Sequence, residues 1–292
     1  MRLSNSTTMT ELNDLATPYF PSYCPGCGDI AIWAAIKKAA VEKGWDNTNT
    51  TLVAGIGCHG HMVNFIKITS FEGLHGRAIP VSTGIKMVNP RLNVLVITGD
   101  GDLLAEGGNH FLHVCRRNPD MAILLFDNGV YGLTTGQASP TSPQNYISKS
   151  TPLGNPEIPL HPLAVAIAAG ITFAARTYSG DIAATAKMIA QAVDHRGLAI
   201  VDILQPCITF NKGFSHTYYQ DNTYVLDTNY DLTNKTWAFE KSLEWGPKNI
   251  PLGIFYREER PVLETVVSTT NEPLVSVSPN KRDISELLKK YV

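Results

Sequence analysis

Three things are scarce in this chain of 292 residues: long apolar runs, an excess of charge of either sign, and cysteine. No apolar run approaches the roughly 18 residues that a membrane-spanning helix needs, and the first residues are polar, without the apolar core of a signal peptide. The formal net charge of −2 gives no basic excess of the kind that indicates nucleic-acid binding. We therefore expect a cytoplasmic protein that binds neither a membrane nor nucleic acid.

The cysteines are few, and their number and spacing are informative. There are five, and an odd number in a chain of this length argues against a disulfide framework. Cys24 and Cys27 are separated by Pro-Gly, a CxxC spacing that is typical of metal or redox chemistry. The other three, Cys58, Cys115 and Cys207, are far apart in the sequence.

Short apolar runs alternate with helical patterns, which predicts a doubly wound, mostly parallel α/β sheet. The helix that begins near Ile30 has a plausible C-cap at Gly44, and the helix of 181–194 has Asp181 near its N-terminus. Residues 61–92 are less regular, with short helical patterns near 62–68 and 81–88. The expected strands are 51–56, 94–97, 122–126, 172–175 and 198–204, and the expected helices are 30–43, 163–170 and 181–194.

The chain is expected to divide into three parts. Residues 1–20 form a mobile polar N-terminal arm, 21–215 the main domain, and 216–292 a C-terminal extension that packs on the domain or on a partner. Residues 139–162 are rich in proline, and loops of this length inside compact domains tend to be functional or bound by a partner. We expect a neighbouring subunit to order this loop.

Polar side chains follow two of the expected strands, where each strand ends. Gly99, Asp100, Gly101 and Asp102 come directly after one strand, and Asn128 follows the next. The carboxyl ends of parallel strands share one edge of a sheet, so Asp100 and Asn128 can reach the same ion. Hard oxygen ligands suit Mg²⁺, and glycine lets backbone N–H groups approach a phosphate. The segment therefore predicts a magnesium-diphosphate site.

This segment resembles the thiamine diphosphate motif, in which GDG is followed by an asparagine about 25 to 30 residues later. The residues after Asn128 are similar to the loop that closes over the diphosphate in 2-oxoacid:ferredoxin oxidoreductases. The resemblance implies Mg²⁺ ligation by Asp100, Asn128 and the Val130 carbonyl. It implies cofactor contacts from Cys58, Gly99, Asp100, Gly101, Asp102, Asn128, Gly129, Val130, Tyr131, Gly132, Leu133 and Thr134.

Four cysteines lie in loops at the ends of expected strands and helices, so Cys24, Cys27, Cys58 and Cys207 could converge on one sulfur site. Spacing alone slightly favours zinc over an iron–sulfur cluster. Cys58, however, should lie on the same rim as Asp100, where a cluster could accept electrons singly and zinc could not. Cys115 lies within an expected helix and is predicted to be a buried thiol.

The four cysteines also match, one by one, those that bind a 4Fe–4S cluster in the ferredoxin oxidoreductases. The chain thus resembles the beta subunit of that family. The resemblance implies oxidative decarboxylation of a 2-oxoacid with coenzyme A, giving acyl-CoA, CO₂ and reduced ferredoxin. It also implies an obligate alpha subunit, which supplies the glutamate that activates the aminopyrimidine and part of the substrate pocket. The stretches GLHGR, GGNHFLHVCRRN and YGLTTGQASPTS favour 2-oxoglutarate as the substrate.

At His61 the sequence departs from the family that it resembles. Members of that family carry a lysine three residues after the cysteine that matches Cys58. A histidine there would change charge and reach, so His61 is a candidate for the substrate pocket. His59 is a weaker candidate, and His110 and His113 are expected to be structural. Asp102 is expected either to contact the cofactor or to cap the following helix.

Three alternatives stay open at this point. The chain could belong to a pyruvate or broad-specificity 2-oxoacid enzyme of the same family. It could instead be a non-oxidative thiamine diphosphate decarboxylase or synthase, although four converging cysteines would then have no use. The third alternative is a zinc-stabilised binding module in which the GDG turn is only structural.

Overall fold

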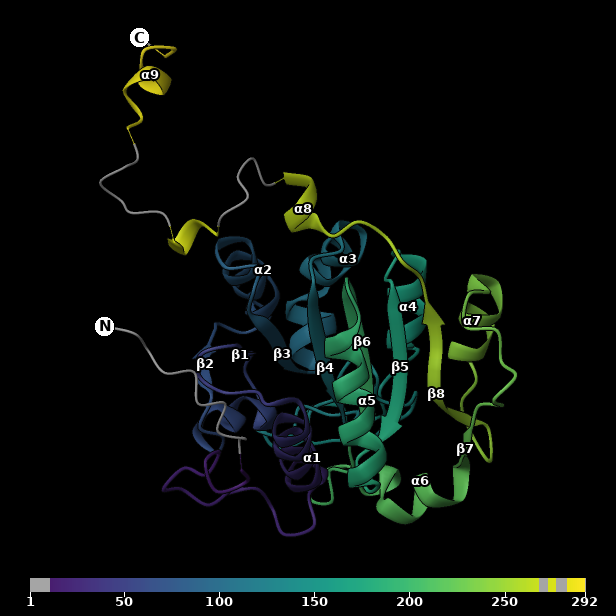
Figure 1. Ribbon diagram of the computed structural model, residues 1–292. Coiled ribbons are helices and arrows are strands. Elements are labelled where there is room, and N and C mark those ends of the chain that lie inside the picture. Colours follow the sequence, from purple (N-terminus) through teal and green to yellow (C-terminus); the bar gives the residue numbers. More distant parts are fainter. Residues whose placement is uncertain (1–10, 268–272, 277–282, 292) are drawn as a thin grey trace.

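The computed structural model describes residues 11–267, 273–276 and 283–291. Its centre is an eight-stranded sheet in the order β2-β1-β3-β4-β6-β5-β8-β7 (Figure 1). Neighbouring strands are parallel except for β5 and β8, which run antiparallel. The strands are β1 Thr50–Ala54, β2 Thr69–Glu72, β3 Asn93–Gly99, β4 Met121–Asp127, β5 Phe173–Tyr178, β6 Leu198–Leu204, β7 Thr223–Val225 and β8 Ile250–Arg257.

Helices cover both faces of the sheet, which explains why its central strands are continuous apolar runs rather than alternating ones. Strands β1, β4, β5 and β6 are buried along their whole length. On one face, α1 (Gly28–Lys43) and α5 (Ile182–Asp194) pack against the sheet. The other face is covered by α2 (Ala78–Val88), α3 (Gly108–Arg117), α4 (Pro162–Ala168) and α7 (Lys235–Ser242).

The remaining helices are short. A 3-10 helix, Cys58–Asn64, follows β1, and a π-helical turn, Asp102–Glu106, precedes α3. The others are the 3-10 helices Lys212–Phe214 and Leu274–Ser276, and α6 His216–Asn222, α8 Leu263–Val267 and α9 Ser285–Leu288. No helix among the described residues has the length and apolar character needed to cross a membrane.

The predicted helix ends are found in the structure. Gly44 is the C-cap of α1 with φ +65°, in the left-handed region that glycine enters without strain. The Asp181 carboxylate accepts a hydrogen bond from the Ala184 N–H and so caps the N-terminus of α5. The pattern near 81–88 belongs to α2, whereas the one near 62–68 forms only the tighter helix Cys58–Asn64.

Three strands were not expected from the sequence. All four residues of β2 are exposed at the edge of the sheet, so β2 has no apolar run. Strands β7 and β8 come from the segment after residue 216, and β8 pairs with β5, with an irregularity between Ala174 and Ala175. Residues 216–292 therefore contribute two strands to the main sheet.

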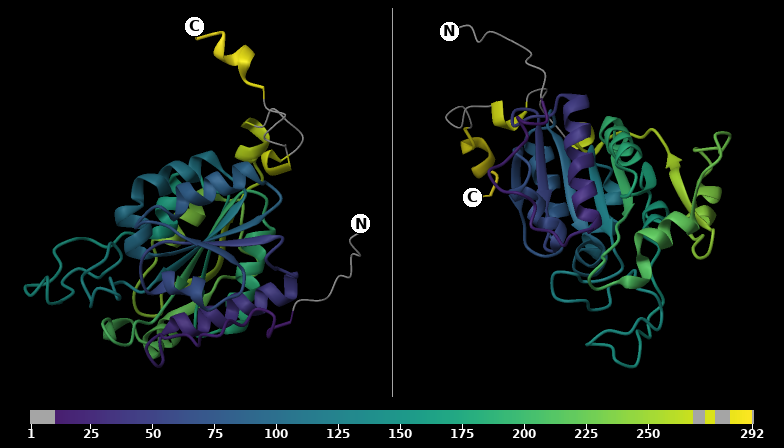
Figure 2. Two further views of the ribbon diagram at one scale, coloured as in Figure 1. Left: turned by 90° about the vertical axis from the view of Figure 1, so that its left-hand side faces the viewer. Right: turned by 90° about the horizontal axis from the view of Figure 1, so that it is seen from below.

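Two further segments are placed by the structure. Residues 1–10 lie outside the described part, but Leu15 is only 1% exposed, and its carbonyl accepts a hydrogen bond from Lys67 N–H. The expectation of a mobile arm is thus wrong at Leu15. Residues 139–161 form no helix or strand and extend away from the sheet as a long teal loop (Figure 2). Ile147, Leu153 and Ile158 of this loop are largely exposed.

Candidate active site

The carboxyl ends of β1, β3, β4 and β6 meet at one edge of the sheet, the lower edge in Figure 1. The loops that leave these strands carry Cys58, Asp100, Asn128 and Cys207, in that order. This is the edge at which open parallel sheets bind ligands. The chain therefore brings its predicted cofactor residues together with Cys58 and Cys207.

Asp100 is buried immediately after β3, at 2% exposure. Its Oδ2 accepts hydrogen bonds from the hydroxyls of Ser139 at 2.5 Å and Thr141 at 2.6 Å. Burial raises the pKa of the Asp100 carboxyl, and the two hydroxyl donors partly oppose that shift. Ser139 and Thr141 belong to the proline-rich loop, so this loop holds the orientation of a predicted metal ligand.

Asn128 follows β4, and its side chain is held in place by two neighbours. Its Nδ2 donates to Gln205 Oε1 at 2.8 Å, and its Oδ1 accepts from the Val130 N–H at 3.0 Å. Gly129 makes the sharp turn between them with φ +66°. The two bonds fix the amide, and Oδ1 keeps a second lone pair for a ligand. Asp100 and Asn128 line the same pocket.

Asp102 does not cap α3, whose N-cap residue is Gly107. The Asp102 carboxylate instead accepts from the Ile56 N–H, the Gly76 N–H and the Thr98 hydroxyl, at 2.7 to 3.0 Å. These three donors lie after β1, before α2 and in β3. Asp102 therefore ties three segments of the rim together, and the prediction that it caps the helix was wrong.

Two histidines contact this network. His59 is buried, and its Nε2 accepts a hydrogen bond from the Gly99 N–H at 3.1 Å. Burial lowers the pKa of His59 to about 4, which keeps the ring neutral and suited to that bond. His75 is half-buried, lines the pocket, and places Nδ1 2.7 Å from Asp102 Oδ1. The sequence indicated only a turn at His75, because the fold alone brings the segment after β2 to the rim.

The pocket at this rim is lined by most of the predicted cofactor residues. Glycine at position 101 is required there, because a Cβ would lie 2.2 Å from the Tyr131 ring. Gly129 shapes the turn and does not line the pocket. The lining residues are Ile56, Gly57, Cys58, His59, His75, Gly99, Asp100, Gly101, Asp102, Asn128, Val130, Tyr131, Gly132, Leu133 and Thr134.

The four predicted cysteines line a second cavity, of about 250 Å³. The Cys58 and Cys207 sulfurs both lie near Gly132, each 3.6 Å from the position that a Cβ would occupy there. Burial raises the pKa of the Cys58 thiol to about 12, and burial also raises the pKa of Cys27 and Cys207. In the part of the chain that the structure describes, no three His, Cys, Asp or Glu side chains are arranged to hold a single metal ion.

That arrangement bears on the choice between zinc and a cluster. Tetrahedral zinc needs all four sulfurs about 2.3 Å from one point. In a 4Fe–4S cluster each iron takes one thiolate, so the four sulfurs lie farther apart. Four cysteines around one cavity fit a cluster, which takes one thiolate at each of its irons. Cys115, by contrast, is fully buried in α3, as predicted.

The two cavities share part of their lining. Cys58, Asn128, Gly132 and Leu133 line both of them. His61, the predicted substrate-pocket residue, is exposed and lines the cysteine cavity. A ligand held by Asp100 and Asn128 would thus lie next to whatever the cysteines hold.

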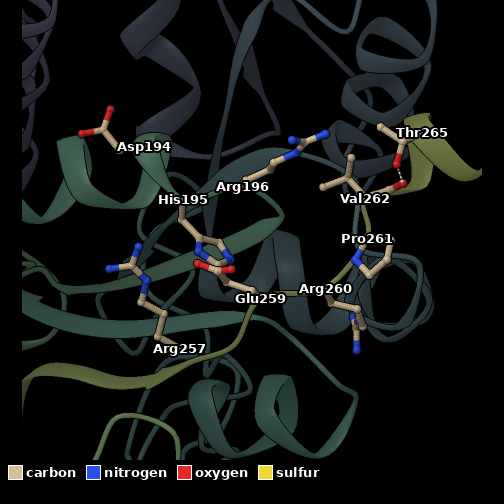
Figure 3. A pocket seen from close by; sticks show the side chains of 9 residues that line it. All are labelled: Asp194, His195, Arg196, Arg257, Glu259, Arg260, Pro261, Val262 and Thr265. Atoms are coloured by element: carbon tan, nitrogen blue, oxygen red, sulfur yellow. Dashed lines mark hydrogen bonds between the residues drawn. The ribbon is translucent and has the colours of Figure 1, made fainter.

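A cavity of about 580 Å³ lies at the opposite edge of the sheet. Arg196, Arg257 and Arg260 line it, together with His195 and Glu259. Figure 3 shows that the three arginine side chains point in different directions and do not converge on one position. Arg260 donates instead to the carbonyls of Cys115 and Gly170. Size alone therefore does not identify the functional site here.

Comparisons with known proteins agree with this geometry. Residues 55–203 match the family model of the thiamine pyrophosphate enzyme C-terminal TPP-binding domain, and residues 207–272 match the model of the C-terminal part of the pyruvate ferredoxin oxidoreductase beta chain. A 2-oxoacid:ferredoxin oxidoreductase subunit beta from Sulfolobus sp is 43% identical over 284 residues, covering 92% of this chain and 93% of the relative. The 2-oxoglutarate oxidoreductase subunit KorB of Mycobacterium tuberculosis is 42% identical over 65% of this chain and 51% of its own length.

A solved structure is similar over nearly the whole chain. It is the 2-oxoglutarate:ferredoxin oxidoreductase from Magnetococcus marinus with 2-oxoglutarate, coenzyme A and succinyl-CoA bound. The TM-score is 0.90 at 33% identity, covering 99% of this chain and 98% of the other. With a thiamine-binding domain, this rim and these relatives, the chain belongs to the beta subunits of the 2-oxoacid:ferredoxin oxidoreductases.

Proposed function

We propose that this chain carries the thiamine diphosphate, the Mg²⁺ and the 4Fe–4S cluster of an enzyme that oxidatively decarboxylates 2-oxoglutarate with coenzyme A. One observation carries the proposal, namely that the Asp100–Asn128 pocket and the cysteine cavity share their lining at Cys58 and Gly132. Bound thiamine diphosphate supplies the carbanion chemistry and holds the electrons that decarboxylation leaves. An adjacent cluster provides an exit for those electrons.

The residues of the pocket have separate tasks in this proposal. Asp100, Asn128 and the Val130 carbonyl hold Mg²⁺, and the N–H groups of the glycine turn face the diphosphate. His75, oriented by Asp102, is a further diphosphate contact. His59 keeps the ends of β1 and β3 together through the Gly99 N–H.

Cys24, Cys27, Cys58 and Cys207 hold the cluster. The raised pKa values of Cys27, Cys58 and Cys207 mean that these thiols lose protons when the metal binds. Gln205 Nε2 lies 3.2 Å from Cys27 Sγ and Gln205 Oε1 accepts from Asn128, so one side chain contacts both sites. Gln205 therefore fixes the cluster ligand relative to the magnesium ligand.

The partner of this chain is an alpha subunit, and ferredoxin receives the electrons. Among the described residues that line the cofactor pocket there is no glutamate to activate the aminopyrimidine. The loop 139–161 supports a protein interface, because it exposes Ile147, Leu153 and Ile158 while it holds Asp100. We expect the chain alone to bind cofactors without decarboxylating 2-oxoacids, and robust turnover by the isolated chain would refute this.

2-Oxoglutarate is favoured as the substrate because the Magnetococcus relative binds it and several similar chains carry that activity in their names. Four other relatives are named only as 2-oxoacid enzymes, which keeps pyruvate and broad specificity as the second candidate. His61 lies at the cysteine cavity, where it can contact a substrate that approaches the thiamine.

The test is co-purification of the native complex without oxygen, followed by ferredoxin reduction with a panel of 2-oxoacids and coenzyme A. We expect brown protein, about four irons per chain and the highest kcat/KM with 2-oxoglutarate. Cys207→Ser should lose iron, whereas the matched Cys115→Ser should keep it. Colourless protein with stoichiometric zinc would eliminate the cluster, and a preference for pyruvate would change the substrate alone.

A further inference from the structure

Arg176 is a cation buried in the sheet, and two nitrogens of its guanidinium have no hydrogen-bond partner among the described residues. It lies in β5 at 0% exposure, and its Nε donates to Asp202 Oδ2 on β6 at 2.8 Å. Within the described residues its Nη1 and Nη2 have no hydrogen-bond partner, and neither does Asp202 Oδ1. The guanidinium lies over the rings of Trp245 and Phe255, with Cζ 5.4 Å from each centroid, but these contacts supply no hydrogen-bond acceptor. Burying charged donors without acceptors is unfavourable, so the two nitrogens favour an acceptor from outside the chain.

A cavity of about 230 Å³ lies against this guanidinium. One side of the cavity is polar, formed by Arg176, Gln144 and His161. The rest of the lining is largely apolar and includes Leu160, Phe214 and Trp245, whose ring centroid lies 5.4 Å from Arg176 Cζ. None of the residues that line this cavity lines the thiamine pocket or the cysteine cavity.

The shape of the free donor group selects the chemistry of a ligand. Two adjacent guanidinium nitrogens form a planar fork that matches the two oxygens of a carboxylate. Water can occupy the polar part of the cavity, where Arg176, Gln144 and His161 supply partners, but it leaves the apolar part of the lining without a favourable contact. The volume is below the 300–1,000 Å³ typical of drug-sized ligands, so only a few heavy atoms fit.

The surrounding charges favour a single negative charge on the ligand. Asp202 already neutralises one side of the guanidinium, and Asp127 also lines the cavity, where its Oδ1 accepts from Thr141. Because Asp202 already pairs with the guanidinium, a monoanion brings less uncompensated charge into this buried place than phosphate or a dicarboxylate would. Half-buried His161 also lines the cavity and lies within electrostatic reach of Arg176 and Asp202.

We propose that this cavity binds a small aliphatic monocarboxylate, with its two oxygens on Nη1 and Nη2 of Arg176 and its hydrocarbon part against Leu160, Phe214 and Trp245. The site is distinct from the proposed reaction site and does not depend on it. A hydroxyl nevertheless connects the two, because Thr141 contacts both Asp127, on the cavity, and Asp100, in the thiamine pocket. The Thr141 hydroxyl therefore lies between the cavity and the proposed magnesium ligand.

The experiment is a calorimetric titration of the full-length chain with isobutyrate, together with crystals soaked in isobutyrate. We expect isobutyrate to bind at least ten times more tightly than the neutral isobutyramide, with density for its carboxylate on Arg176. Arg176→Gln should abolish binding. Since Arg176 is buried and its loss could prevent folding, Leu160→Trp is the main variant, because it fills the partly exposed mouth of the cavity and leaves the guanidinium intact.

Leu153→Trp is the matched control, because Leu153 lies in the same loop, is 98% exposed and does not line the cavity. Leu160→Trp should weaken isobutyrate binding at least tenfold, and Leu153→Trp should leave it unchanged. The proposal fails if isobutyrate does not bind, if both tryptophan variants bind it equally, if isobutyramide binds as well, or if the crystals show only water beside Arg176.

Discussion

At the scale of single residues, Asp102 shows how one buried carboxylate positions a whole rim. Its two oxygens accept from two backbone N–H groups and one hydroxyl that belong to three separate segments, and it also orients His75. Both carboxylate oxygens act as acceptors for these donors. An asparagine at this position would replace one of the oxygens with an NH₂ group, which donates where an acceptor is needed.

Asp102→Asn should therefore lower the free energy of unfolding by about 1–3 kcal/mol, the cost of leaving buried donors without an acceptor. Urea denaturation of the full-length chain measures this. Asp221→Asn, at an exposed position, is the control and should change stability by less than about 0.5 kcal/mol. Equal stability of the two variants would show that the carboxylate is not the anchor.

At the scale of elements, the cap of α1 gives a second test. Gly44 has φ +65° with nothing within 4 Å of where a Cβ would lie, so alanine there meets no clash but adopts a strained left-handed backbone. We expect Gly44→Ala to destabilise the chain by about 1 kcal/mol.

Gly84 supplies the matched control, because it lies inside α2 with equally open surroundings. Gly84→Ala should raise stability by about 0.5–1 kcal/mol, since alanine loses less backbone entropy in a helix. Thermal unfolding of both variants should thus shift the Tm in opposite directions. Shifts of the same sign would contradict the assignment of strain to the backbone.

The elements also show what could be predicted from the sequence. The central strands are buried apolar runs that end in glycine turns, so the placement of Asp100 and Asn128 after neighbouring strands follows from local pattern. The exposed edge strand β2 has no such pattern, so its place in the sheet depends on the tertiary fold. Strand β8 does contain apolar residues, but it lies in the segment expected to be an extension, and only the fold places it between β5 and β7.

The same division applies to the site. The predicted cofactor residues are close in sequence to strand ends, and nearly all of them line one pocket. Ser139, Thr141 and His75 were not predicted as site residues, because they come from a loop and a turn whose positions depend on long-range contacts. A hydroxyl that orients a carboxylate has no sequence signature of its own.

At the scale of the whole molecule, the long loop 139–161 contacts the site with its inner residues and solvent with its outer ones. Its inner residues hold Asp100, while its outer residues expose Ile158 and Ile147. Such an arrangement suits a subunit interface that also supports the site, because covering exposed apolar side chains with a partner removes them from water, which is favourable.

Ile158→Asp should therefore reduce the amount of partner subunit that co-purifies with the tagged chain, and leave the Tm of the isolated chain within about 2 °C. Val225→Asp, also at an exposed apolar position but on β7, is the control and should leave co-purification unchanged. Loss of the partner with both variants, or with neither, would contradict an interface at the loop.

Thr141 leads to one more consequence, which concerns protons. Its hydroxyl has a single hydrogen, yet Oγ1 lies within hydrogen-bonding distance of two carboxyl oxygens, Asp100 Oδ2 at 2.6 Å and Asp127 Oδ1 at 2.7 Å. Both contacts can be hydrogen bonds only if one of the two carboxyls carries a proton of its own. The raised pKa values of Asp100 and Asp127, caused chiefly by burial, agree with this.

Where Asp100 carries that proton, Mg²⁺ must displace it, so Mg²⁺ binding should release up to one proton and weaken as the pH falls. Calorimetry of Mg²⁺ with thiamine diphosphate in two buffers of different ionisation enthalpy counts the protons released. Asp100→Asn, which has no carboxyl to deprotonate, should bind more weakly and release fewer. An affinity that is constant as the pH falls would show that Asp100 is already ionised and carries no proton for the cation to displace.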